Sequence, residues 1–254
     1  MATGKLWIGT GWKMNKTRDE AAAWVSAVAP RSFPSGLQPF VIPPFTSIAV
    51  VAEALAATDF YVGAQDIHWA DAGAWTGEVS AAMVKDCGAT IVELGHSERR
   101  AHFGETDERV ARKVTTALRY GLIPLICIGE TATDKDENRA DSVLAHQVRV
   151  ALGGVAPEDR HSTVLLAYEP VWAIGEGGTP ATPGYVQARH AAIADIAREV
   201  IGRPVPCLYG GSVNADNCRD YVRQPGVDGL FIGRSAWQAE GFLEIVGLCA
   251  DGRI

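Results

Sequence analysis

The stretch TVLLAYE (163–169) reads as a buried β-strand that ends in a carboxylate, Glu169. Its apolar side chains do not alternate with polar ones, which is typical of a strand in a parallel sheet that is covered on both faces. A helix-like stretch follows near residues 184–201. The strand and this helix form one βα unit, and the rest of the chain repeats it.

Seven more strand-like runs surround this one along the chain. They are KLWIG (5–9), PFVI (39–42), FYVGA (60–64), TIVELG (90–95), IPLICIG (123–129), PVPCLYG (204–210) and DGLFIG (228–233). Further helix-like stretches alternate with the strands, near residues 17–29, 46–57, 79–87, 106–120, 137–152, 215–223 and 237–248. The pairs Thr46-Ser47, Thr106-Asp107 and Thr182-Pro183 suit helix N-termini.

Eight strand–helix pairs without a linker or a break in composition decide the fold class. Eight βα units with no second domain favour a closed barrel over an open, doubly wound sheet. The sequence therefore predicts an α/β protein, a (β/α)8 TIM barrel that forms a single domain over residues 1–254.

The bulk composition excludes several partners. The chain has 254 residues, is 47% hydrophobic and carries a net charge of −7, which argues against a nucleic-acid partner. No apolar run approaches the roughly 18–20 residues of a membrane span. The N-terminus MATGKLWIG lacks a signal-peptide pattern, so we expect a cytoplasmic protein. The five cysteines are widely spaced and odd in number, and we expect them to be reduced thiols.

In such a barrel the active site lies at the carboxyl ends of the strands. Unusual polar or glycine-rich segments follow five of the predicted strands. They are Lys13 after the first, GHSERR (95–100), YEPVWAIGEGGTPATP (168–183), YGGSVN (209–214) and IGRSAW (232–237). Their clustering at one end of the barrel carries more information than any single motif.

Two of these residues suggest acid–base chemistry. Glu169 follows an apolar run, and a dehydrated position should raise its pKa toward use as a general base. The alternative is a buried glutamate paired with an arginine. His96 precedes a predicted helix start at Ser97-Glu98, where the helix N-terminus favours a neutral imidazole that can donate to a carbonyl. A purely structural histidine is the alternative.

Three glycine-rich segments indicate a lid and an anion site. Residues 170–183 resemble a lid with an apolar body and a glycine-rich tip, although an ordinary surface loop is the alternative. The turns Gly210-Gly211-Ser212 and Gly233-Arg234-Ser235 follow the last two strands, where such barrels commonly bind phosphate.

The sequence lacks the motifs of several other kinds of site. It contains no Walker A motif, no G-x-G-x-x-G opening a helix and no G-x-S-x-G elbow, and its six histidines lack metal-ligand spacing. We therefore expect neither a metal nor a cofactor. A base, a neutral electrophile, a cation, a lid and an anion site suit proton abstraction beside a carbonyl in a phosphorylated substrate.

Seven segments resemble the signature segments of the triosephosphate isomerase family, in family order and over nearly the whole chain. They are WKMN (12–15), GAQ (63–65), TGEVS (76–80), ELGHSERR (93–100), CIGE (127–130), YEPVWAIG (168–175) and YGGSV (209–213). This family is itself the standard example of a glutamate base working with a neutral histidine, so the roles that follow are implied by the resemblance.

The resemblance implies a role for each candidate residue. Glu169 would be the base that moves the proton between adjacent carbons, His96 the neutral electrophile and Lys13 the cation that steadies the enediolate and the phosphate. Glu98 would be a supporting carboxylate. Backbone amides of Gly175, Ser212, Gly233 and Arg234 would hold the phosphate. The family is dimeric, so the resemblance also implies a homodimer in which the loop 65–79 places Thr76 near the active site of the neighbouring subunit.

The sequence departs from the family pattern around the substrate. Gly11 stands where the glycolytic enzyme has Asn, Arg234 stands where it has Gly, and the lid reads Gly175-Glu176-Gly177-Gly178 with Pro180 inserted. Replacing an amide side chain by hydrogen should open room for about one carbon and its hydroxyl, and the lost hydrogen bonds should weaken triose binding by ~1–3 kcal/mol.

These departures, with HWAD (68–71) and GRSAW (233–237), resemble the branch of the family that isomerises L-erythrulose 1-phosphate. That tetrulose phosphate is our favoured substrate. Glycolytic triosephosphate isomerase is the first alternative, and a barrel that binds phosphosugars without catalysis is the second. The roles of Glu176 and Arg234 stay open between substrate contact, mutual pairing and exposure to solvent.

Overall fold

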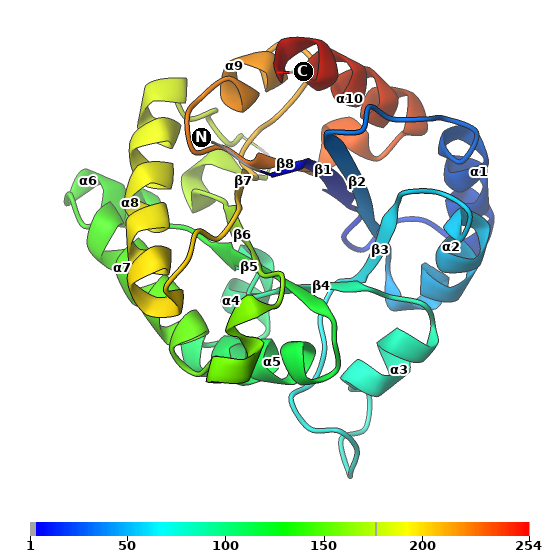
Figure 1. Ribbon diagram of the computed structural model, residues 1–254, viewed down its shortest axis with the longest axis horizontal. Coiled ribbons are helices and arrows are strands. Elements are labelled where there is room, and N and C mark those ends of the chain that lie inside the picture. Colours follow the sequence, from blue (N-terminus) through cyan, green and yellow to red (C-terminus); the bar gives the residue numbers. More distant parts are fainter. Residues whose placement is uncertain (1–3, 176, 254) are drawn as a thin grey trace.

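The chain forms a closed barrel of eight parallel strands inside a ring of helices (Figure 1). The computed structural model describes residues 4–175 and 177–253. The strands are β1 (Leu6–Gly11), β2 (Leu37–Ile42), β3 (Tyr61–Ala64), β4 (Ile91–Leu94), β5 (Ile123–Ile128), β6 (Leu165–Tyr168), β7 (Cys207–Tyr209) and β8 (Gly229–Ile232). They pair in sequence order and β1 also pairs with β8, so the predicted (β/α)8 fold is confirmed.

Helices follow every strand. They are α1 (Arg18–Val28), α2 (Ile48–Leu55), α3 (Ala81–Asp86), α4 (Ser97–His102), α5 (Asp107–Arg119), α6 (Ala132–Asp136), α7 (Ala140–Gly153), α8 (Pro183–Ile201), α9 (Cys218–Val222) and α10 (Ala239–Arg253), with short 3-10 turns at Phe45–Ser47, Pro157–His161, Val171–Ala173 and Arg234–Ala236. The sequence did not predict α6.

Side-chain caps explain where several helices begin. The hydroxyl of Thr106 accepts the amide of Arg109, and that of Thr182 accepts the amide of Tyr185, as expected for N-caps. The expected cap at Thr46-Ser47 is wrong in detail. The chain there first makes a 3-10 turn, and the Ser47 side chain makes no capping hydrogen bond to α2.

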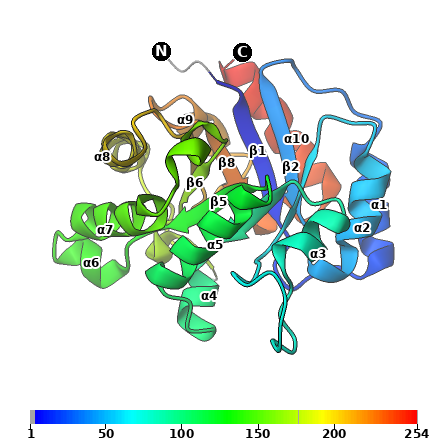
Figure 2. The same cartoon turned by 60° about the horizontal axis from the view of Figure 1, so that its bottom comes forward.

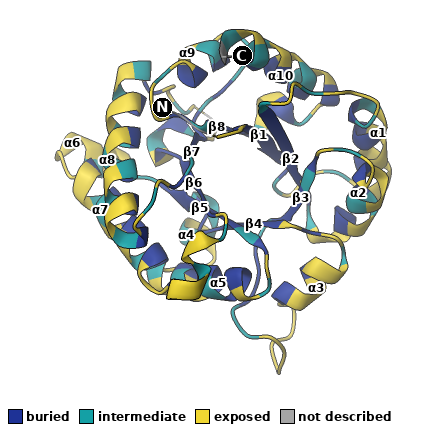
Figure 3. Cartoon of the chain, in the orientation of Figure 1, coloured by how far each residue is buried: buried dark blue, intermediate teal, exposed yellow. Residues whose placement is uncertain are grey.

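The barrel interior is filled by side chains from alternate positions of the strands, and the buried strands stand out from the exposed outer faces of the helices in Figure 3. On β1 two of these inward positions are glycines. A Cβ on Gly9 would lie 2.3 Å from the ring of Phe40, and one on Gly11 would lie 2.9 Å from Cζ of Phe231. The two rings stack with centroids 5.7 Å apart. The glycines therefore leave the space that this aromatic pair fills.

The two ends of the barrel differ. Figure 2 shows both termini at one end, and α4 with the loop between β3 and α3 at the other. That loop, 65–79, projects from the ring, and its residues 71–78 are all exposed. The indole of Trp75 is 49% exposed at its tip and lies 4.4 Å, between ring centroids, from His68.

A buried cluster of charges anchors the base of this loop. Lys113 of α5 donates to both carboxylate oxygens of Asp66, at 2.7 and 2.8 Å, and also to Glu105. Arg99 of α4 lies 2.7 Å from Asp66. Burial raises the pKa of Asp66 to about 6, although Lys113 and Arg99 oppose that shift. The cluster joins the projecting loop to α4, the helix that follows His96.

Two smaller expectations concern cysteines and membranes. Cys127, Cys207, Cys218 and Cys249 are buried free cysteines, and Cys87 is a partly buried one. Among the described helices, none is long and apolar enough to cross a membrane.

Candidate active site

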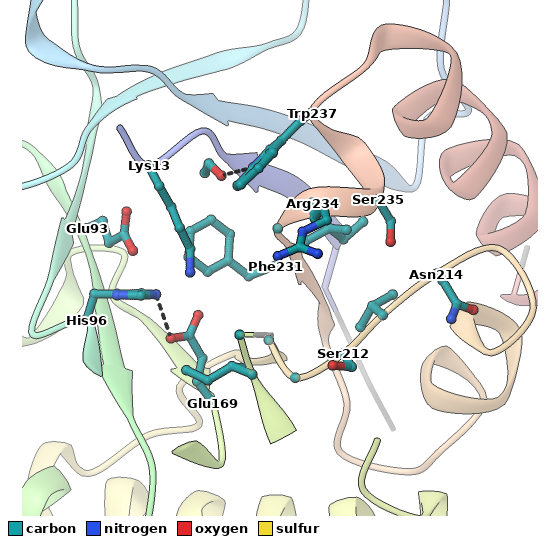
Figure 4. A pocket seen from close by; sticks show the side chains of 18 residues that line it. Lys13, Glu93, His96, Glu169, Ser212, Asn214, Phe231, Arg234, Ser235 and Trp237 are labelled. Carbon is teal, nitrogen blue, oxygen red and sulfur yellow. Dashed lines mark hydrogen bonds and ion pairs between the residues drawn. The ribbon is translucent and has the colours of Figure 1, made fainter. Parts of the chain in front are cut away.

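A cavity of about 280 Å³ opens at the carboxyl ends of the strands (Figure 4). Every predicted site residue except Glu98 lines it. The lining residues are Gly11, Lys13, Glu93, His96, Glu169, Ile174, Gly175, Gly210, Gly211, Ser212, Val213, Asn214, Phe231, Ile232, Gly233, Arg234, Ser235 and Trp237. Glu98 instead pairs with Lys13, whose Nζ lies 2.5 Å from Glu98 Oε1.

The hydrogen bonds of His96 determine which of its ring nitrogens carries the proton. His96 is the N-cap of α4, and its Nδ1 accepts the backbone N–H of Glu98 at 3.2 Å. In the neutral ring the proton is therefore on Nε2, which lies 3.5 Å from Glu169 Oε2. Burial, together with the nearby charge of Lys13, lowers the pKa of His96 to about 4. The imidazole can thus donate a hydrogen bond to a substrate oxygen while it stays uncharged.

Glu169 is a carboxylate in a nearly dry position. Its side chain is 5% exposed, and Oε2 has no hydrogen-bond partner among the described residues. Burial raises the pKa of Glu169 to about 8, against the opposite effect of Lys13. Within the described ranges no arginine forms an ion pair with it, so the paired-glutamate alternative does not hold. A poorly solvated carboxylate beside an open cavity is suited to accept a proton from carbon.

Lys13 is held in place by its backbone and its side chain. Its φ of 52° lies in the left-handed region, which is costly for a residue other than glycine. The side chain of Gln65 donates to the Lys13 carbonyl at 2.8 Å, and Glu98 accepts from its ammonium group. These contacts fix the ammonium group at the mouth of the cavity.

The two glycine-rich turns meet the lid at the opposite side of the cavity. Both the amide and the hydroxyl of Ser212 donate to the carbonyl of Ala173, at 2.9 and 2.7 Å. Ile174 and Gly175 of the lid, and Gly233 and Arg234 of the second turn, also line the cavity. Glu176 lies outside the described residues. The predicted lid therefore contacts the first of these turns directly, through Ala173 and Ser212.

The start of the lid rests on one buried carboxylate. Glu130 Oε1 accepts hydrogen bonds from Tyr168, Trp172 and Tyr185, at 3.1, 2.9 and 2.9 Å. Lys135 lies over the Trp172 ring, with Nζ 3.8 Å from its centroid. Trp172 therefore ties the start of the lid to this carboxylate through its indole N–H.

The sequence analysis gave no individual role to Glu93, Phe231 or Trp237, which also line the cavity. Trp237 donates its indole N–H to the carbonyl of Gly11 at 2.9 Å. Phe231 corrects our expectation for Gly11. The space beside Gly11 is not simply vacant, because the Phe231 ring occupies the place of a side chain there. Glu93 was visible in the sequence as the single charge in the apolar run IVEL (91–94).

Metal binding has no support in the described part of the chain, where no group of three His, Cys, Asp or Glu side chains is placed to hold an ion. The arrangement instead offers a carboxylate base, a neutral imidazole donor, an ammonium group and two glycine-rich turns. A (β/α)8 barrel with this site at the carboxyl ends of its strands defines a barrel enzyme.

Comparison with known proteins identifies the family. Residues 6–249 match the family model described as triosephosphate isomerase. The chain belongs to the triosephosphate isomerase family, and the sequence-based expectation of an isomerase is confirmed.

Three relatives are similar over almost their whole length, and each is named L-erythrulose-1-phosphate isomerase. The protein from Rhizobium rhizogenes is 55% identical over 251 residues, covering 98% of this chain and 96% of the relative. That from Brucella abortus biovar 1 is 56% identical, covering 97% of each. That from Mesorhizobium japonicum is 52% identical, covering 95% and 96%.

Proposed function

We propose that this protein isomerises L-erythrulose 1-phosphate without a cofactor, by moving a proton between adjacent carbons. The observation that carries the proposal is the pair formed by Glu169 and neutral His96, 3.5 Å apart at the cavity. Relatives more than half identical to the chain carry the name of this activity, which supports the choice of substrate.

Each residue of the site has its own role in the proposed reaction. Glu169 takes the proton from C3 of the ketose while His96 donates from Nε2 to the carbonyl oxygen at C2, and an enediol(ate) forms. Lys13 steadies its negative charge, and Glu98 positions Lys13. Return of the proton to C2 leaves the carbonyl at C3. The product is a tetrulose phosphate in which the carbonyl lies one carbon further from the phosphate.

The phosphate binds at the two glycine-rich turns, through backbone amides of Ser212, Gly233, Arg234 and Gly175 of the lid. The Ser212 amide donates to Ala173, so phosphate must displace that carbonyl as it binds. Phosphate binding and movement of the lid are therefore one event. A closed lid keeps water from the enediolate.

The first alternative is the interconversion of the triose phosphates, and the second is phosphosugar binding without catalysis. The decisive experiment compares kcat/KM for L-erythrulose 1-phosphate with that for glyceraldehyde 3-phosphate. We expect the higher value for the tetrulose, and a higher value for the triose would overturn the choice of substrate.

The change Glu169→Gln should lower kcat by about 10²–10⁴-fold. Unchanged turnover of both substrates would contradict catalysis by this base.

We also propose that the protein is a homodimer joined through the loop 65–79. The loop projects from the barrel and carries the exposed Trp75 at its tip. Met14, next to Lys13, is 96% exposed, as expected for a residue that a second subunit covers. In this assembly Thr76 approaches the neighbouring active site.

A further inference from the structure

Glu93 is a buried acid of the cavity that the proposed reaction does not use. It lies on β4, two positions after the inward-facing Ile91, and is 6% exposed. No lysine or arginine of the described chain lies within ion-pair distance of it. Its Oε1 lies 3.9 Å from Sγ of Cys127, which donates to it. A buried acid kept without a salt bridge costs stability, so it calls for a functional reason.

The surroundings of Glu93 favour its uncharged form. Burial raises the pKa of Glu93 well above its usual value, and the nearby Glu169 raises it further while Lys13 opposes the shift. A neutral carboxyl carries one O–H donor and keeps acceptor sites. It can therefore both give and receive a hydrogen bond, as a substrate hydroxyl requires.

The position of Glu93 in the barrel corresponds to the end of the substrate that is away from the phosphate. The phosphate turns follow β7 and β8, and β4 lies across the eight-stranded ring from β8. Figure 4 shows Glu93 beside Lys13 and His96, on the side of the cavity away from Ser212. A substrate with its phosphate at the turns and its reacting carbons at Glu169 and His96 points its last carbon toward Glu93.

Gly11 and Phe231 complete this corner. A Cβ on residue 11 would lie 3.6 Å from Oε2 of Glu93 and 2.9 Å from the Phe231 ring. A larger residue at position 11 would thus stand between the Glu93 carboxyl and the cavity. Hydrogen at that position leaves the carboxyl accessible, and the ring gives the corner an apolar wall.

We propose that Glu93 is a specificity-determining residue that hydrogen-bonds the C4 hydroxyl of the tetrulose phosphate, in a corner shaped by Gly11 and Phe231. The inference rests on the proposed function, because a triose phosphate has no carbon at this place. Glu93 thus selects substrate length and does not take part in the proton transfer.

The test compares two variants on two substrates. Glu93→Leu removes the hydrogen bond, and we expect kcat/KM for L-erythrulose 1-phosphate to fall about 10–100-fold. The value for dihydroxyacetone phosphate should change less than about threefold, because the catalytic groups are untouched. Glu93→Gln keeps a neutral donor and acceptor of similar size, so it should retain most of the tetrulose activity. Equal losses on both substrates from Glu93→Leu, or none on the tetrulose, would overturn the proposal.

A substrate analogue tests the wild-type protein as well, so the proposal does not depend on the folding of a variant. The 4-deoxy analogue of L-erythrulose 1-phosphate should react about 10–100-fold less efficiently than the parent ketose. In Glu93→Leu that difference should disappear, as in a double-mutant cycle. Equal wild-type rates for the parent and the analogue refute the role of Glu93. A wild-type preference for triose refutes the proposed function itself, so the two failures are distinguishable.

Discussion

His96 shows how one residue is set to a single protonation state. Its Nδ1 is occupied by the backbone N–H of Glu98, its ring is buried, and Lys13 lies nearby. Each feature disfavours a second proton on the ring. The imidazole is therefore suited to polarise a carbonyl as a neutral donor, and Glu98 and Glu169 lie close to it without forming a charged pair.

The state of His96 predicts a pH effect on stability. In the unfolded chain His96 has a pKa of 6.5, whereas in the folded protein its pKa is about 4. Between these two pH values the unfolded chain therefore binds a proton that the folded protein does not. The free energy of unfolding contributed by His96 is therefore fully present above pH 6.5 and is lost as pH falls toward 4. Nitrogen NMR shifts of His96 should remain those of a neutral ring at pH 5. The variant His96→Gln should lose less stability than the wild type between pH 6.5 and 4, and equal losses would contradict the assignment.

At the scale of secondary structure, alternation along the strands decides which residues reach the cavity. On β6 the side chains of Leu165 and Ala167 point into the barrel, and Glu169, two positions further on, lines the cavity. On β4 Ile91 and Glu93 follow the same alternation. All eight strands were predictable from their apolar runs. Which side chains of each strand point into the barrel could not be predicted, because both faces of such a strand are apolar.

The same limit explains what could be predicted about the site. Lys13, His96 and Glu169 were recognisable because each stands at the end of a strand in a distinctive motif, and the fold places them together. Glu93 lies within a strand, where nothing in the local sequence shows which way it points. Phe231 was hidden for another reason. Its contact with Gly11 joins β8 to β1 across 220 residues and depends on the closed barrel.

The charged cluster at the base of the loop 65–79 predicts a large effect from one side chain. Lys113→Met removes the buried lysine that pairs with Asp66 and Glu105 and leaves these two buried carboxylates with the partly exposed Arg99. We expect the free energy of unfolding to fall by about 3–5 kcal/mol. The matched change Lys85→Met removes an exposed lysine and should cost less than about 1 kcal/mol. Denaturant titration measures both, and similar small losses would show that the cluster is not stabilising.

For the whole molecule, the proposed dimer predicts a coupling between assembly and activity. Trp75→Glu puts a charge at the tip of the projecting loop, so we expect dissociation to a species of 27.0 kDa and a large loss of kcat. Ala188→Glu adds the same charge on the exposed side of α8, away from the loop, and should leave both unchanged. Sedimentation velocity and turnover are the measurements. A wild-type protein that sediments at 27.0 kDa at micromolar concentration would contradict the dimer.

The aromatic pair inside the barrel has a consequence for how this protein diverged from its relatives. Gly11 and Phe231 share one space, so enlarging residue 11 alone overpacks the barrel by forcing the ring aside, while shrinking Phe231 alone leaves a hole against Phe40. Each single substitution is penalised, and only the two together restore packing. The effect of either change thus depends on the other, and this epistasis would make a substrate preference set by Gly11 and Phe231 difficult to reverse by single mutations.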